Sequence, residues 1–290
     1  MPAGGSTAGA PCCRLAASHR PTRRTARYPS DIADAQWAEL DPLLPDPACL
    51  AGRGGRWEKH CRRVIVDAIF YVVDNGIKWR ALPADFPPWQ TVYKRFAAWE
   101  KAGASQRLLD AVRDRVRLAE GRVAVPSAAV MDSQSVRAAA TVGRATRGWD
   151  GGKKVAGRKR HIVVDTLDML VAVLVTPAST QDRVAARSLL RRTRDTAGGR
   201  MALVWADGGY TGPLIDWARK TLRLTVEIVQ RPQVPYFTVL PRRWVVERSL
   251  AWITGHRRCV RDYERLPRHH EAMVRWSMIR ITSRRLTQPQ

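Results

Sequence analysis

Two aspartates stand directly after short apolar runs, in the places where strands of an α/β sheet would end. Asp132 follows AAVM, and Asp207 follows LVWA and precedes Gly208 and Gly209. The carboxyl ends of strands are a common place for functional side chains in open α/β sheets. The two glycines let the chain turn away and leave room for a bulky ligand beside Asp207. An ordinary turn residue or helix cap is the alternative for either aspartate taken alone.

A third carboxylate stands in the stretch WVVERSLAW, residues 244–252. On a helix, Glu247 would have Trp244 three residues before it and Leu250 three residues after it. An unpaired buried charge is expensive, so this glutamate is expected to have a partner. A salt bridge to Arg243, one turn earlier, is one possibility, and a metal ion is the other.

Together the three carboxylates could perform metal-dependent chemistry on a phosphodiester. Asp132, Asp207 and Glu247 can surround a pair of Mg²⁺ ions if two lie on neighbouring strands and one on a helix packed over them. One ion would activate the attacking oxygen and the other would stabilise the leaving oxygen. We therefore predict a two-metal site, in which Mn²⁺ can substitute for Mg²⁺.

The elements that must position these carboxylates can be predicted from periodicity. From about Val123 short strand-like runs alternate with helical patterns. The expected order is three strands, then helix, strand, helix, strand and helix, at SAAVMDSQSV, RKRHIVVDTLDML, VAVLVTPAST, DRVAARSLLRRTRD, MALVWADGGY, GPLIDWARKTL, LTVEIVQR and PRRWVVERSLAWITGHRR. Such an order predicts an α/β domain over residues 122–290, with a mixed sheet flanked by helices. We interpret Asp182, at a junction between a strand and a helix, as a helix N-cap, with catalysis as the alternative. We interpret PRRWVVERSLAWITGHRR as the last major helix.

Two further regions precede this domain. Residues 1–27 contain no acidic residue and no long apolar run, so they are predicted to be a disordered basic tail and not a secretory signal. An organellar transit peptide, a DNA-grasping arm and a start codon assigned too early all remain open. Residues 28–121 show helical periodicity and resemble a helix-turn-helix DNA-binding domain in which Lys94 and Arg95 point outward. A small bundle packed on the main domain is the alternative.

The charge points to nucleic acid. Lys and Arg number 50 against 26 Asp and Glu, a formal net charge of +24, and such a field attracts polyanions. The segment GGKKVAGRKRH, residues 151–161, combines basic side chains with mobile glycines, and it is predicted to contact DNA phosphates. A solvated hairpin is the alternative for this segment, whose proposed contact residues are Lys153, Lys154, Arg158 and Lys159.

Other classes of protein and site are not favoured. No stretch approaches the ~20 apolar residues of a membrane span, so no membrane partner is expected. Five cysteines without regular spacing suit a reducing cytoplasm better than a disulfide framework. Cys49, His60 and Cys61 lie close in sequence, but no second pair of ligands accompanies them, so zinc is not expected there.

The chain resembles a bacterial insertion-sequence transposase of the DDE class, in the superfamily named after insertion sequences four and five. The resemblance covers about Tyr28 to Leu286. Its blocks are DAQWAELDPLLP, NGIKWRALPADFPPWQTVYKRFAAW, VMDSQSV, GGKKVAGRKRHIVVDTLDMLVAVLVTPASTQD, WADGGYTG and RWVVERSLAWI. It implies a ribonuclease-H-like fold with Asp132, Asp207 and Glu247 as the catalytic triad. It also implies Mg²⁺-dependent cleavage at the element's ends and joining of the freed 3′-hydroxyl to target DNA.

The spacing fits this family, with 75 positions from Asp132 to Asp207 (207 − 132) and 40 from Asp207 to Glu247 (247 − 207). The family's signature around the glutamate is only partly present. Arg243 fills the arginine place, whereas Leu240 stands where tyrosine is expected and Thr254 where a basic residue is. Phosphate contact could pass to the basic residues one turn further on, which are Arg257 and Arg258.

Two rival functions remain at this point. A ribonuclease-H-like nuclease that cuts without joining would use the same three carboxylates, because only the attacking oxygen differs. A catalytically silent DNA-binding remnant is the other. The expected partners are double-stranded DNA, as transposon ends and target, and a second copy of the chain in a homodimer. The expected place of action is the cytoplasm, at the nucleoid.

Overall fold

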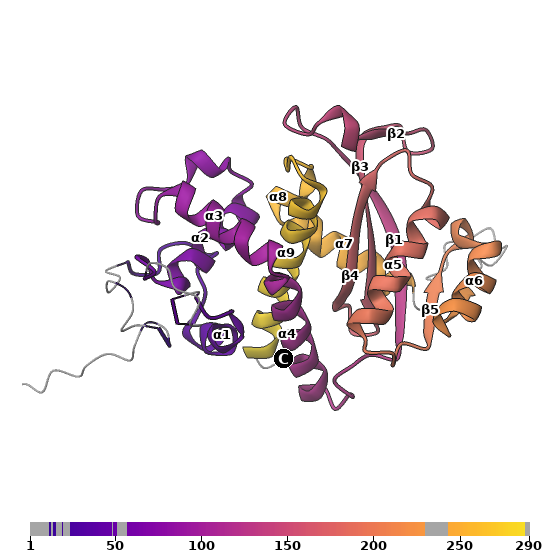
Figure 1. The fold of residues 1–290 in the computed structure, drawn as a ribbon, viewed down its shortest axis with the longest axis horizontal. Coiled ribbons are helices and arrows are strands. Elements are labelled where there is room, and N and C mark those ends of the chain that lie inside the picture. Colours follow the sequence, from indigo (N-terminus) through magenta and orange to yellow (C-terminus); the bar gives the residue numbers. More distant parts are fainter. Residues whose placement is uncertain are drawn as a thin grey trace, which may run out of the picture.

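The computed structural model describes residues 12, 14–15, 19, 24–47, 49–50, 57–229 and 243–287, apart from the side chain of Arg243. Figure 1 shows a group of N-terminal helices on one side and a sheet on the other. The N-terminal helices are α1 (Asp34–Leu40), α2 (Arg62–Asn75), α3 (Trp89–Lys101) and α4 (Ala104–Ala119), with short 3₁₀ turns at Asp41–Leu43 and Trp79–Ala81.

The sheet is mixed, as the sequence predicts. Its strands are β1 (Ala128–Arg137), β2 (Gly148–Asp150), β3 (Val155–Asp165), β4 (Leu170–Pro177), β5 (Leu203–Ala206) and β6 (Thr225–Ile228). β3 pairs antiparallel with β1, β2 and β4. On the other side β1 pairs parallel with β5, and β5 pairs parallel with β6. The three successive strands of the prediction are β1, β3 and β4, and the short β2 was not foreseen.

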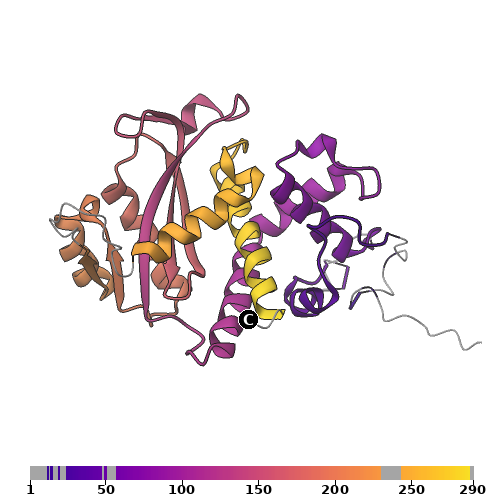
Figure 2. The same cartoon turned by 180° about the vertical axis from the view of Figure 1, so that it is seen from behind.

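The two faces of the sheet are covered by different helices. α5 (Asp182–Thr196) and α6 (Pro213–Leu222) cover one face and share a core with Ala129, Met131 and Val204. The other face, with Val130 and Trp205, packs under α7 (Arg243–Gly255) in a core that continues into α9 (Pro267–Thr287) and the N-terminal helices. The short α8 (Arg257–Val260) connects α7 with the segment leading to α9. In Figure 2, the view from behind, α7 crosses in front of the sheet.

The C-terminal helix α9 lies among the N-terminal helices. It packs against α4, α2 and α1 as well as β4, and Figure 1 shows α4 and α9 between the sheet and α1–α3. Trp276 at its centre is fully buried against Phe70 of α2 and Trp99 of α3, with ring centroids 5.8 Å and 6.1 Å apart. The prediction that α7 is the last major helix was therefore wrong. The boundary expected at residue 121 also does not separate two cores, because α9 fills the core of the N-terminal part.

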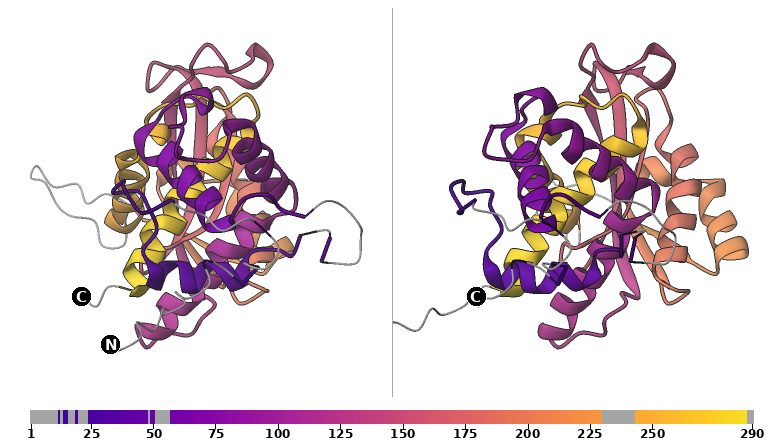
Figure 3. Two further views of the ribbon diagram at one scale, coloured as in Figure 1. Left: turned by 90° about the vertical axis from the view of Figure 1, so that its left-hand side faces the viewer. Right: turned by 60° about the vertical axis from the view of Figure 1, so that its left-hand side comes forward.

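The described part of the predicted tail contacts the rest of the chain. Arg24 is nearly buried and forms ion pairs with Asp31 at 2.7 Å, Asp67 at 3.2 Å and Asp85 at 3.3 Å. Further toward the N-terminus, Arg14 pairs with Asp46 at 2.6 Å. A disordered tail would not make such contacts, so the prediction of disorder is wrong for these described residues. The other residues of the tail lie outside the described ranges. Figure 3 shows the N-terminal helices in front of α9 and the sheet.

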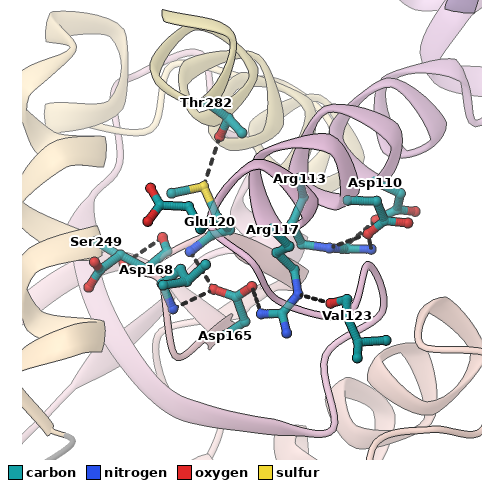
Figure 4. A network of polar contacts seen from close by, with 12 residues as sticks. Asp110, Arg113, Arg117, Glu120, Val123, Asp165, Asp168, Ser249 and Thr282 are labelled. Atoms are coloured by element: carbon teal, nitrogen blue, oxygen red, sulfur yellow. Dashed lines mark hydrogen bonds and ion pairs between the residues drawn. The ribbon is translucent and has the colours of Figure 1, made fainter. Parts of the chain in front are cut away.

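A polar network ties the helical part to the turn between β3 and β4 (Figure 4). Arg117 of α4 donates to Asp165 at 2.6 Å and to the Val123 carbonyl at 2.9 Å. Asp168, in the left-handed region with φ 67°, accepts a hydrogen bond from Ser249 of α7 at its carbonyl. This network holds α4 and α7 at the end of the sheet where β1 begins. None of the described helices is long and apolar enough to cross a membrane.

Candidate active site

Asp132 and Asp207 stand level with each other on neighbouring parallel strands. In the register of β1 and β5 Val130 pairs with Trp205, an offset of 75 (205 − 130) that equals the offset between the two aspartates (207 − 132). β5 ends at Ala206, and the backbone of Asp207 is still extended with φ −83° and ψ 177°. Neighbouring strands lie about 4.8 Å apart, so level residues on parallel strands are adjacent and point to the same face.

The two aspartates belong to the sheet face that α7 covers. Side chains alternate along a strand, so Asp132 shares the face of Val130 and Asp207 that of Trp205. Both apolar residues contribute to the core beneath α7. α7 packs against β1 and β3 on this face and carries Glu247 in its second turn. The fold therefore brings all three predicted carboxylates to one side of the sheet.

Glu247 is exposed, which corrects the expectation that it is buried among apolar side chains. Trp244 and Ala251, three before it and four after it, are exposed as well, while Leu250 faces the core. Residues three or four apart share a helix face, and here most of that face is turned to solvent. The cost of burying a charge therefore gives no reason to expect a partner for Glu247. The alternative salt bridge to Arg243 involves a side chain outside the described residues.

Tyr210 is buried in the core under α5 and α6, within electrostatic reach of both aspartates. Burial raises the pKa of its phenol well above the usual range, and the negative charges of Asp182, Asp132 and Asp207 raise it further. The phenol therefore stays protonated and neutral at any physiological pH. It sits near three carboxylates without adding to their mutual repulsion.

Asp182 is the site residue whose role the sequence did not reveal. The N-cap of α5 is Gln181, and Asp182 is the first residue of the helix, so the N-cap interpretation was wrong. One oxygen of Asp182 accepts from the Ser133 hydroxyl at 2.9 Å and lies 3.1 Å from the Lys159 ammonium. The Ser133 backbone N–H donates to Asp132 at 2.7 Å. Ser133 thereby links Asp132 to Asp182, and the only sequence signal was the position of Asp182 at the junction between a strand and a helix.

A surface hollow adjoins this group. Its volume is about 370 Å³, and its lining includes Trp149, Asp150, Lys159, Asp182 and Gly209. Trp149 is 57% exposed at its rim. The hollow therefore combines an accessible aromatic ring with charged groups next to the carboxylates.

Comparison with known protein families agrees with this arrangement. A family model described as a transposase DDE domain matches residues 124–281, more than half of the 290 residues. A second model, for transposases of the IS4/5 family, matches residues 32–109. The chain belongs to the DDE transposases of the IS4/5 group. The resemblance found in the sequence is confirmed, and with it the ribonuclease-H-like fold of the catalytic part. DDE transposase domains in general use divalent metal ions.

A curated relative of this transposase comes from the same class of mobile element. The "Insertion element IS402 uncharacterized 16.2 kDa protein" of Burkholderia cepacia is 31% identical over 109 residues. The alignment covers 37% of the transposase chain and 73% of that protein. This transposase is therefore similar to an insertion-element protein as well as to the family models.

The predicted basic loop of the transposase, residues 151–161, consists of a short turn and the first part of strand β3. Only residues 151–154 form the turn, and β3 begins at Val155. Lys153 and Lys154 are exposed in this turn, and the Lys153 ammonium donates to the Ser133 carbonyl at 3.2 Å. Contact of these two lysines with DNA stays a prediction.

Arg158 and Lys159 are not placed to contact DNA, contrary to the prediction. Arg158 is fully buried and pairs with Asp262 at 2.8 Å. Lys159 is nearly buried, lies between Asp182 at 3.1 Å and Asp150 at 3.6 Å, and donates to a backbone carbonyl. Both side chains belong to β3 and are held by carboxylates, so the structure turns them inward.

The basic residues around α7 also divide between surface and interior. Arg257 is exposed, whereas Arg258 is buried, pairs with Glu264 at 2.6 Å and donates to the Ile77 carbonyl at 2.8 Å. The predicted phosphate contact through Arg258 is therefore contradicted, while that through Arg257 stays a prediction. The side chain of Arg243 lies outside the described residues, so its predicted contact is not tested.

The exposed face of α3 is polar and basic. Gln90, Lys94, Ala98 and Lys101 lie at helical spacing on this face and are all exposed. Arg95 is half-buried and pairs with Glu58 at 2.8 Å, so it is less available than Lys94.

α2 and α3 do not form a tight helix-turn-helix. The segment 76–88 between them is longer than the 3–4 residues typical of that motif. The helices pack with α9 as a bundle, which was the alternative left open.

Proposed function

We propose that this transposase binds the terminal inverted repeats of an insertion sequence, cleaves at its ends and joins the freed 3′-hydroxyl to target DNA. The observation that carries the proposal is the level placement of Asp132 and Asp207 on adjacent parallel strands, facing the helix with Glu247. Two neighbouring carboxylates repel each other unless a cation lies between them. Hydrolysis without joining remains the competing activity.

Asp132, Asp207 and Glu247 fit the ligand preferences of Mg²⁺, with Mn²⁺ as a substitute. The donors are carboxylate oxygens, the hard ligands that Mg²⁺ prefers, and Glu247 is exposed and able to approach an ion at the sheet edge. When bound, two such ions would lower the barrier by polarising the scissile phosphate and the attacking and leaving oxygens. We propose this metal role for all three carboxylates.

Other side chains of the site would position the carboxylates and the DNA. Ser133 holds Asp132 through its backbone N–H and Asp182 through its hydroxyl, which fixes the orientation of Asp132. Lys153, Lys154 and Arg257 would contact phosphates near the cleaved bond. Such contacts fix the position of DNA without reading its sequence.

Sequence readout is proposed for the exposed face of α3. Gln90 can form paired hydrogen bonds with adenine and Lys94 can donate to guanine if this face enters the major groove. A second copy of the chain in a homodimer would bring two element ends together.

The test is a cleavage and joining assay with the full chain and DNA carrying the inverted repeats that flank its coding sequence. Mg²⁺-dependent nicks at the element's ends and products joined to target DNA are expected. Asp207→Asn should abolish both, whereas Asp216→Asn, an exposed carboxylate on α6, should abolish neither. End nicking without joined products would instead support a nuclease, and no end-specific nicking would contradict the proposal.

A further inference from the structure

Three metal-binding side chains meet far from the carboxylates of the sheet. The Cys12 and Cys61 sulfurs and a His19 ring nitrogen all lie within 4.8 Å of one another. Cys12 and His19 belong to the basic N-terminal segment, and Cys61 precedes α2. Sequence reasoning did not group these three residues, because the expectation of no zinc concerned Cys49, His60 and Cys61.

The spacing of two of these atoms matches a tetrahedral zinc site. With Zn–S near 2.3 Å and Zn–N near 2.05 Å, a tetrahedral angle places the two donor atoms about 3.6 Å apart. The Cys12 Sγ to His19 Nε2 distance is 3.6 Å. Two sulfurs and one imidazole nitrogen are a soft donor set, which selects zinc over Mg²⁺ and distinguishes this group from the triad carboxylates.

The segment that carries Cys12 is held in place by other contacts. The Trp37 indole donates to the Cys12 carbonyl at 2.9 Å, and Leu15 is buried in the core. Arg14 donates through its backbone N–H to Asp41 at 2.5 Å and through its side chain to the Leu44 carbonyl. The position of Cys12 is therefore fixed by contacts other than those with His19 and Cys61, as a metal site requires.

Cys61 is the N-cap residue of α2, a helix of 14 residues, and it is buried. Its side chain makes no capping hydrogen bond, so the sulfur does not serve to cap the helix.

We propose that Cys12, His19 and Cys61 bind one structural Zn²⁺ ion that fastens the N-terminal segment to the start of α2. The fourth ligand is water. The ion closes a loop between residues 49 positions apart. Because binding and docking of the segment occur together, the binding energy of the metal contributes to the stability of the folded chain.

The experiment measures metal in the purified full-length protein. After expression with added zinc and gel filtration, elemental analysis should find about one zinc per chain. Cys12→Ser and His19→Asn should each lower the zinc content at least tenfold. The matched controls Cys259→Ser and His60→Asn should retain it, and so should Asp207→Asn, which leaves this site intact while altering the carboxylate site.

A second measurement does not depend on how well the variants fold. Parent protein reconstituted with Co²⁺ should show the intense visible bands of tetrahedral cobalt with thiolate ligands, and these should disappear with one equivalent of zinc. Parent protein without stoichiometric zinc and without these bands would overturn the proposal. Zinc retained in Cys12→Ser and His19→Asn, or lost in Asp207→Asn, would overturn it as well, because the metal would then lie elsewhere.

Discussion

Substitution of Arg158 tests whether this basic residue stabilises the folded transposase or binds DNA. Its guanidinium is fully buried and donates to Asp262 at 2.8 Å, to the Glu264 carbonyl at 2.8 Å, to the Arg265 carbonyl at 3.0 Å and to the backbone and hydroxyl of Thr146. Arg158→Met preserves much of the side-chain volume and removes the charge and all the donors. Asp262 would then be a buried carboxylate without its guanidinium partner.

Removing one member of a buried ion pair costs about 3–5 kcal/mol of unfolding free energy. Asp262 keeps His270 at 3.4 Å and the backbone N–H of Glu264 at 2.8 Å, which favours the lower end of this range. The three carbonyls that lose a donor favour the upper end, because buried acceptors without donors are destabilising. A loss of about 3–5 kcal/mol corresponds to a fall in Tm of roughly 6–20 °C for a chain of this size.

Thermal or urea unfolding followed by circular dichroism measures this effect. The matched control is Lys154→Met, in the exposed hairpin turn, which should change the unfolding free energy by less than about 0.5 kcal/mol. In DNA-binding titrations at several salt concentrations the pattern should reverse. Folded Arg158→Met should keep the parent's salt dependence, and Lys154→Met should lower its slope by about 0.9. If Arg158→Met unfolds like the parent but lowers the salt slope, our reasoning about its burial is refuted.

Three further results are expected. A fragment of residues 24–121 should not fold cooperatively in a circular dichroism melt, because α9 supplies part of its core; a sharp melting transition would contradict this. Lys94→Ser should lower the preference for end DNA over random duplex in mobility shifts, and unchanged preference would place readout elsewhere. Burial lowers the pKa of His161 from 6.5 to about 4, so the unfolded chain binds a proton in this range that the folded chain does not. The parent should therefore lose up to about 3 kcal/mol as the pH falls from 6.5 to 4, His161→Asn should lose less in pH-dependent urea melts, and equal losses would show that His161 is not responsible.

The strands and the two aspartates were predictable because their signals are local. The apolar run before Asp207 does mark the end of β5, whereas β1 continues past Asp132 to Arg137, so the strand end expected at Asp132 was wrong. The strands and helices predicted after Val123 are all present. The 75 positions between Asp132 and Asp207 could be counted in the sequence. Only the structure shows that this number equals the offset between paired residues of β1 and β5.

The positions of charged side chains depended on distant partners and could not be predicted in this way. Arg158 is buried by Asp262, 104 positions further along the chain, and nothing near it in sequence signals this. Glu247 was expected to be buried because its neighbours are apolar, but Trp244 is itself 43% exposed. Composition alone does not tell which face of a helix meets the core.

The helix α9 was missed for a different reason. It is buried on most sides, with polar side chains such as His270 and Arg275 inside as well as Trp276, so it has no apolar stripe of the kind that marks a surface helix. Arg275 is held inside by Glu100 of α3. The helical pattern in the sequence was therefore weak although the helix is 21 residues long.

The central claim is that Asp132, Asp207 and Glu247 act together as one metal site. Its most direct test is electron paramagnetic resonance of Mn²⁺ titrated into the complex of the full-length protein with end DNA. The parent is expected to bind two ions per chain, and Asp132→Asn, Asp207→Asn and Glu247→Gln should each lose binding and cleavage together, while Asp216→Asn keeps both. Undiminished Mn²⁺ binding and cleavage in Glu247→Gln, with losses in the two aspartate variants, would contradict the claim and remove Glu247 from the site.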